Sequence, residues 1–152
     1  MKKIWLALVL VMMPAFAIAD TMDKYMEMLR SDFRTTKTRV LTEGLKLTEA
    51  EGQKFWPIQR EYETELAKIG DQRLQLIKDY AAHYDSLSPA MARQLTDRAF
   101  KLESSRLSLL KKYTDKESKA VSPMVAARFA QIEATVNAMI DLQIRANLPL
   151  VP

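Results

Sequence analysis

An apolar side chain recurs at every third or fourth position through most of this chain, from Met22 to Ile140. This spacing matches the ~3.6-residue period of an α-helix rather than the alternation of a β-strand. The sequence also has only 3 glycines in 152 residues, too few for the frequent tight turns of an all-β fold. We therefore predict an all-α fold in which residues 20–152 form a single domain.

The first helix is expected to span residues 22–43, with Gly44 just past its end. Glycine favours that position because it readily adopts the left-handed conformation that ends a helix. Thr48 is expected to begin a second helix, since its hydroxyl can accept a backbone N–H of the first turn. Glu51 can bond back to the backbone of Thr48, which would complete a capping box. The second helix is expected to extend to Tyr84.

Two serine-proline pairs predict the starts of a third and a fourth helix, Ser88-Pro89 and Ser122-Pro123. In each pair the serine hydroxyl can cap the helix, and proline is well suited to the first helical position because its missing N–H is not needed there. The fourth helix is expected to end at Asn147.

The second and third helices are expected to be longer than the outer two. This difference predicts a long antiparallel helical hairpin with the first and fourth helices folded along it, four helices in all. Pro57 is expected to kink the second helix, because it lacks an N–H and crowds the preceding turn. An elongated chain buries less surface by itself, so we also predict a homodimer.

The first 19 residues have the pattern of a cleaved signal peptide. Lys2 and Lys3 precede an apolar run, and the small residues Ala17 and Ala19 precede the predicted cut before Asp20. The apolar run of 13 residues is shorter than the ~20 that a membrane-spanning helix needs. We therefore predict a protein exported to the bacterial periplasm, with no transmembrane segment in the mature chain.

The charge balance changes once the signal peptide is removed. The whole chain has 23 Lys and Arg against 19 Asp and Glu, a net charge of +4. Because Lys2 and Lys3 leave with the signal peptide, 21 basic residues remain against 19 acidic ones, and the net charge falls to +2. So small an excess gives no support for a nucleic-acid partner.

The composition also limits the chemistry. The absence of cysteine excludes disulfides, thiolate metal sites and a cysteine nucleophile, and a single histidine leaves little for a catalytic triad. No pair of acids stands in a recognisable catalytic arrangement. We therefore predict that the protein is not an enzyme and has no cofactor.

A basic stripe is expected on the first helix, where Arg30, Arg34 and Lys37 lie at positions i, i+4 and i+7. Such a stripe can bind an acidic partner or an anionic surface. The alternative interpretation is an ordinary solvated helix face.

An aromatic edge on the second helix provides the apolar candidates, Phe55, Trp56 and Ile58. Exposed apolar residues of this kind can hold the apolar segments of another protein. The alternative interpretation is packing in the core or at a dimer contact, although Trp56 lies one position off the main apolar stripe.

Four residues are weaker candidates for binding metal. Met22, Met26 and Met28 carry thioethers that suit Cu(I), and His83 lies near two aspartates. The alternatives are methionines that fill gaps in the core and a surface histidine.

Three segments share an apolar residue, a capping hydroxyl and a following helix, beginning at Leu47, Leu87 and Val121. The first, Leu47-Thr48-Glu49-Ala50-Glu51, resembles the LTxxQ signature of the small periplasmic stress proteins typified by CpxP and Spy, with Glu51 where that family has glutamine. The segments around Phe55-Trp56-Pro57 and Ala127-Arg128-Phe129 also resemble a set of exported bacterial proteins of unassigned activity. The CpxP-like resemblance implies a cradle-shaped helical-hairpin dimer that binds unfolded proteins or a sensor domain without ATP.

We therefore predict a periplasmic protein-binding stress protein, either an ATP-independent chaperone or a sensor adaptor. Its partners would be unfolded or envelope proteins, or a sensor domain. The alternatives are a structural envelope protein with one fixed partner and a metal-responsive periplasmic sensor.

Overall fold

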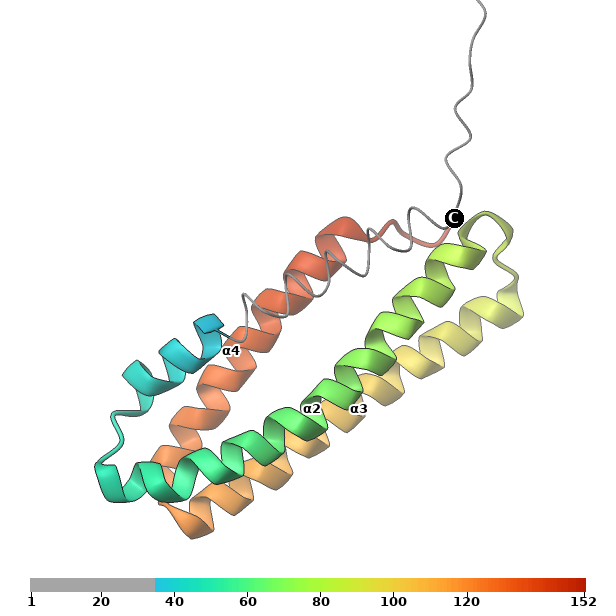
Figure 1. Ribbon diagram of the computed structural model, residues 1–152. Coiled ribbons are helices and arrows are strands. Elements are labelled where there is room, and N and C mark those ends of the chain that lie inside the picture. Colours follow the sequence, from blue (N-terminus) through green and yellow to red (C-terminus); the bar gives the residue numbers. More distant parts are fainter. Residues whose placement is uncertain (1–34) are drawn as a thin grey trace, which may run out of the picture.

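The computed structural model describes residues 35–152, and these form helices with no strand among them. Residues 35–45 are helical and are followed by α2, a short 3₁₀ turn η1, α3 and α4 (Figure 1). Their bounds are Glu49–His83 for α2, Tyr84–Ser86 for η1, Pro89–Ala120 for α3 and Pro123–Asn147 for α4. The all-α prediction is confirmed for this part of the chain.

The helices α2 and α3 form the predicted antiparallel hairpin (Figure 1). They contain 35 and 32 residues, whereas α4 contains 25, so the hairpin extends beyond α4. The helical segment 35–45 runs antiparallel to α4, because Lys37 pairs with Glu133 while the carbonyl of Leu45 accepts a bond from Arg128. Residues 35–45 and α4 therefore both lie along the same part of the hairpin.

The three predicted helix starts are confirmed by their caps. The Thr48 hydroxyl accepts the backbone N–H of Glu51 at 3.3 Å, and a Glu51 carboxylate oxygen accepts the backbone N–H of Thr48 at 2.9 Å. The hydroxyls of Ser88 and Ser122 each accept a backbone N–H three residues later at 3.2 Å. These bonds satisfy donors that a helix leaves free in its first turn.

The end of the first helix differs from the prediction. The helix continues through Gly44 to residue 45, and Lys46, with φ of 51°, takes the left-handed conformation expected of Gly44. A Cβ atom on Gly44 would lie 2.8 Å from Cδ1 of Ile132. Gly44 therefore serves close packing against α4 rather than chain reversal. The predicted start of this helix, at residue 22, lies outside the described residues.

Helix α2 runs through Pro57 without a break. Proline has no N–H, so the carbonyl of Gln53 receives no bond from it. Figure 1 shows the axis of α2 changing direction within its first turns, as expected for a helix that contains proline.

Four aromatic rings form the centre of the core, and they come from all three long helices. Phe129 of α4 lies edge-on to Phe55 and Tyr62 of α2, with ring centroids 5.9 and 5.4 Å apart. Tyr62 makes a similar contact with Tyr113 of α3 at 5.4 Å. Aliphatic side chains complete this cluster, namely Leu41, Leu45, Ile58, Leu109 and Val125. Because Leu41 and Leu45 take part, the segment 35–45 belongs to the same core as the hairpin.

Candidate functional site

Lys37, a member of the predicted basic stripe, is buried with 7% of its surface exposed. Its Nζ lies 2.5 Å from a carboxylate oxygen of Glu63 and 2.7 Å from one of Glu133. In this structure Lys37 is therefore not available to an acidic partner, because two carboxylates of the same chain already hold it. The other members of the stripe, Arg30 and Arg34, lie outside the described residues.

The Lys37 contacts belong to a buried polar cluster. The Tyr62 hydroxyl donates a hydrogen bond of 2.9 Å to Glu133, whose side chain is fully buried. Burial raises the pKa of Glu133, and the Lys37 ammonium group opposes that rise. Burial also raises the pKa of Tyr62, as does the neighbouring Glu133. The cluster joins three helical elements and so has a structural role.

Two of the predicted apolar contact residues, Phe55 and Ile58, lie in the core with 0% and 8% of their surfaces exposed. Their side chains face the other helices, so the core-packing alternative describes them in this structure. Trp56 is only partly buried and packs edge-on against Phe55, with ring centroids 5.1 Å apart. Of the three residues, Trp56 alone combines core contact with partial exposure.

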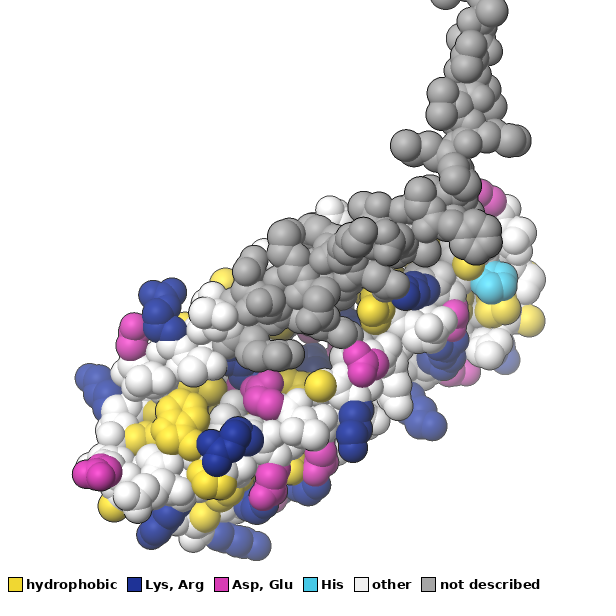
Figure 2. All heavy atoms as spheres, viewed as in Figure 1, with side chains coloured by type: hydrophobic (Ala, Val, Ile, Leu, Met, Phe, Trp, Pro, Cys, Tyr) yellow, Lys and Arg dark blue, Asp and Glu magenta, His cyan; other side chains and the backbone are white. Residues whose placement is uncertain are grey.

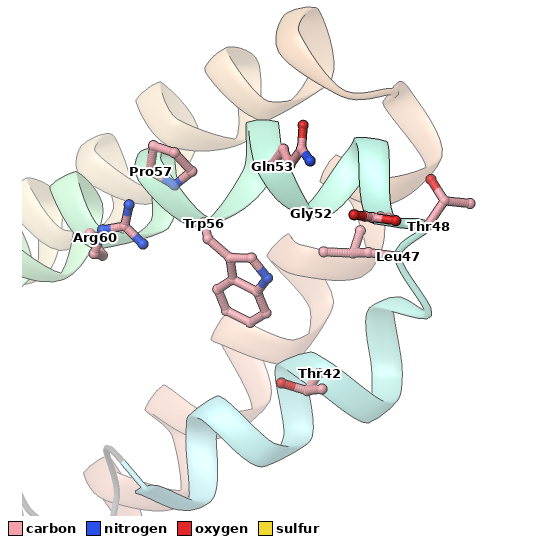
Figure 3. Close-up of a pocket in the computed structure, with 9 residues that line it drawn as sticks. Thr42, Leu47, Thr48, Gly52, Gln53, Trp56, Pro57 and Arg60 are labelled. Carbon is pink, nitrogen blue, oxygen red and sulfur yellow. The ribbon is translucent and has the colours of Figure 1, made fainter.

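Trp56 lines a surface hollow of about 510 Å³ between α2 and the segment 35–45 (Figure 3). Figure 3 shows its indole pointing from α2 toward Thr42 of the neighbouring segment. The remaining lining residues are Leu47, Thr48, Glu49, Gly52, Gln53, Pro57 and Arg60. An apolar ring with a guanidinium nearby can contact an apolar group that carries a negative charge.

Gly52 provides a test of this hollow. A Cβ atom at Gly52 would lie 3.5 Å from Nε1 of Trp56, an ordinary contact distance. Gly52→Ala is therefore expected to raise the free energy of unfolding by about 0.5–1 kcal/mol, because glycine within a helix is destabilising relative to alanine. Urea denaturation of the variant and of the parent chain measures this gain, and a loss of stability would show that the hollow cannot accept a methyl group.

Sequence reasoning missed several apolar side chains that the structure exposes. On α3, Phe100 and Leu107 expose 70% and 69% of their surfaces and lie two turns apart on one face. On α4, Met124, Met139 and Leu142 expose 64%, 55% and 70%. The available signal was their position off the main apolar stripe of each helix. Figure 2 shows separate hydrophobic areas among charges of both signs on one face of the described part.

The part of the chain that the structure describes contains no set of ligands around the candidate metal-binding residues. Among residues 35–152, no group of three or more His, Asp or Glu side chains could hold a metal ion. Nδ1 of His83 lies 2.8 Å from the carbonyl oxygen of Asp79, whose carboxylate accepts hydrogen bonds from Arg98 and Gln75. Met22, Met26 and Met28 lie outside the described residues.

Within residues 35–152, none of the helices combines the length and the hydropathy that a membrane-spanning segment requires.

Comparisons with known proteins gave no match to a protein-family model, a curated protein or a solved structure. The resemblance to the CpxP and Spy family therefore stays a prediction from the sequence.

Proposed function

We propose that this protein is an exported, ATP-independent binding protein that holds exposed apolar segments of other proteins. The observation that carries this proposal is the exposure of large apolar side chains on well-formed helices, above all Phe100 and Leu107 on α3. Large exposed apolar side chains on one helix face can contribute to a protein-binding surface. The predicted signal peptide and the CpxP-like resemblance support a periplasmic stress-response role, as a chaperone or as a sensor adaptor.

Binding of this kind would be reversible and broad. Separate apolar areas offer several small contacts, and removing apolar surface from water stabilises each contact by about 25 cal/mol per Å². Lysines and arginines lie beside acidic residues on the same helices, as in the pair of Lys111 and Asp115. This mixture favours solubility, while the apolar side chains provide the affinity. A homodimer, which we also propose, would double the number of contacts.

Removal of the two exposed apolar residues of α3 tests this function. The double variant Phe100→Ser, Leu107→Ser is expected to lose most of its ability to suppress aggregation of a reduced client protein, because it loses the two large exposed apolar side chains of α3. Light scattering at equal molar amounts of client and protein measures the effect. Since both residues are mainly exposed, the free energy of unfolding should change by less than about 1 kcal/mol.

The matched control is Lys101→Ser, which shortens another exposed side chain of α3. It should suppress aggregation as well as the parent chain does. A parent chain that leaves the light scattering unchanged would contradict the proposed chaperone role.

The hollow beside Trp56 favours a second candidate, a protein with one fixed partner. A shaped site with an indole and a nearby guanidinium would select among partners more strongly than scattered apolar groups do. A single stoichiometric partner, captured by the parent chain and lost with Trp56→Ala, would support this alternative over a general chaperone.

A further inference from the structure

An apolar groove of about 370 Å³ lies at the η1 end of the hairpin. Leu76 and Tyr80 of α2 line one side, and Leu95 and Phe100 of α3 line the other. Ile144 of α4, together with Leu148 and Val151 of the C-terminal tail, completes the apolar lining. This volume falls within the range of about 300–1,000 Å³ typical of ligand sites.

The groove exists because α4 is shorter than the helix beside it. Arg106 of α3 pairs with Asp141 of α4, which fixes the register of these two antiparallel helices. From that pair α3 extends back to Pro89, whereas α4 extends only to Asn147. The first turns of α3 therefore have no α4 beside them, and a groove stays open there.

The C-terminal tail, residues 148–152, lies against this end of the hairpin. The hydroxyl of Tyr80 donates a 3.0 Å hydrogen bond to the carbonyl of Pro149, and that of Tyr84 donates one of 3.1 Å to the carbonyl of Leu150. Both hydrogen bonds are accepted by main-chain carbonyls, a group that every peptide contains. Among the tail side chains, Leu148 and Val151 line the groove, whereas Leu150 is 88% exposed.

We propose that this groove binds an extended apolar peptide segment of another protein, and that the chain's own tail, which lies along one edge of the open volume, competes with that segment for the hydroxyls of Tyr80 and Tyr84. The inference rests on the proposed protein-binding function and adds where the segment binds. The tail is itself an extended apolar peptide, Leu148-Pro149-Leu150-Val151-Pro152, so it shows the class of ligand that the site accepts.

The charges at the groove favour a segment with an acidic residue nearby. Arg73 is paired with Asp141, and Arg106 is paired with Glu103 and Asp141. Arg145 also lines the groove. These three arginines and two carboxylates leave one net positive charge, which complements a negative charge on the incoming segment.

A labelled peptide with the sequence of residues 148–152 provides the probe. A chain that ends at Asn147 is expected to bind this peptide at least about tenfold more tightly than the full chain, because a tethered tail competes at a high effective concentration. Fluorescence anisotropy measures both affinities. The full-length variant Leu148→Asp, Val151→Asp should bind like the truncated chain, since charged side chains favour water over the apolar groove. This second variant keeps the test valid if truncation prevents folding.

Two further variants locate the site in a chain with a released tail. Ala99→Arg places a long side chain in the groove and is expected to abolish peptide binding. Ser108→Arg adds the same side chain to an exposed position of α3 that does not line the groove, and binding should be unchanged. Tyr80→Phe with Tyr84→Phe should weaken binding about tenfold through the loss of two hydrogen bonds.

The inference is overturned if neither tail variant binds the peptide, or if Ala99→Arg leaves binding intact. The same chains are then compared for aggregation suppression, which separates this result from the proposed function. Suppression by the parent chain without peptide binding would overturn the groove and support the chaperone role. Peptide binding as described, without any suppression, would support the groove and overturn the chaperone role.

Discussion

Replacing Glu117 with glutamine is expected to stabilise the protein at pH 8 by up to ~4 kcal/mol while changing its stability at pH 5 far less. Glu117 lies near the end of α3 with 0% of its surface exposed. Neither of its carboxylate oxygens accepts a hydrogen bond within the described part of the chain. Burial raises the pKa of this carboxyl from 4.5 to about 8, and only the charge of Lys116 opposes the rise.

The direction of this pH effect on stability follows from the protons that the folded and the unfolded chain bind. Between pH 4.5 and 8 the folded chain keeps the Glu117 proton, whereas the unfolded chain has released it. Unfolding therefore releases a proton, and stability falls as the pH rises through this range. Above pH 8 the folded chain must hold a buried, unpaired carboxylate. Glutamine has nearly the same shape and carries no charge, so it removes this pH dependence.

Urea denaturation at pH 5, 6.5 and 8 measures the effect as a free energy of unfolding. Glu61→Gln is the matched control, because Glu61 is exposed and pairs with the neighbouring Lys116. This control should keep the pH slope of the parent chain. Some slope should remain in Glu117→Gln, since burial also raises the pKa of Glu133. An unchanged slope in Glu117→Gln would contradict the role assigned to the Glu117 carboxyl.

Replacing Lys37 with methionine is expected to destabilise the protein by about 3–5 kcal/mol, the usual result of removing one partner from a buried ion pair. Methionine keeps most of the side-chain volume but leaves the fully buried Glu133 without its cation. Urea denaturation measures the loss. Hydrogen exchange of residues 35–45 should also become faster, because Lys37 attaches that helical segment to α2 and α4.

A second substitution separates charge from packing. Lys37→Met combined with Glu133→Gln should recover most of the lost stability, because glutamine carries no charge that needs a cation. Its amide oxygen can still accept the hydrogen bond from the Tyr62 hydroxyl. Lys112→Met is the matched surface control: Lys112 pairs with Glu65 but is mainly exposed, so its replacement should cost less than about 1 kcal/mol. Equal losses for Lys37→Met and Lys112→Met would show that burial of the Lys37 pair contributes little.

Much of the fold could be predicted because helix boundaries depend on near neighbours. Thr48, Ser88 and Ser122 cap the helices as predicted, through bonds that span three residues. Gly44 was misjudged because its role depends on Ile132, which is distant in sequence. The dimer, the signal peptide, the periplasmic location and the family resemblance remain predictions from the sequence.

The candidate site was harder to predict, because periodicity indicates which residues share a helix face but not what covers that face. Phe55 and Ile58 were correctly grouped as apolar, yet only the packing of α4 and the segment 35–45 places them inside. Phe100 and Leu107 are apolar too, and no described helix covers them. Chemical type alone could not separate these two pairs.

The sequence by itself determined that the chain forms amphipathic helices and where α2, α3 and α4 begin, because hydrogen-bonded caps and apolar periodicity are local properties. Only the tertiary structure decided that Lys37, Glu117 and Glu133 are buried while Phe100 and Leu107 are exposed. Burial depends on segments brought together from distant parts of the chain, and this burial sets both the altered acidity of Glu117 and the surface left for a partner.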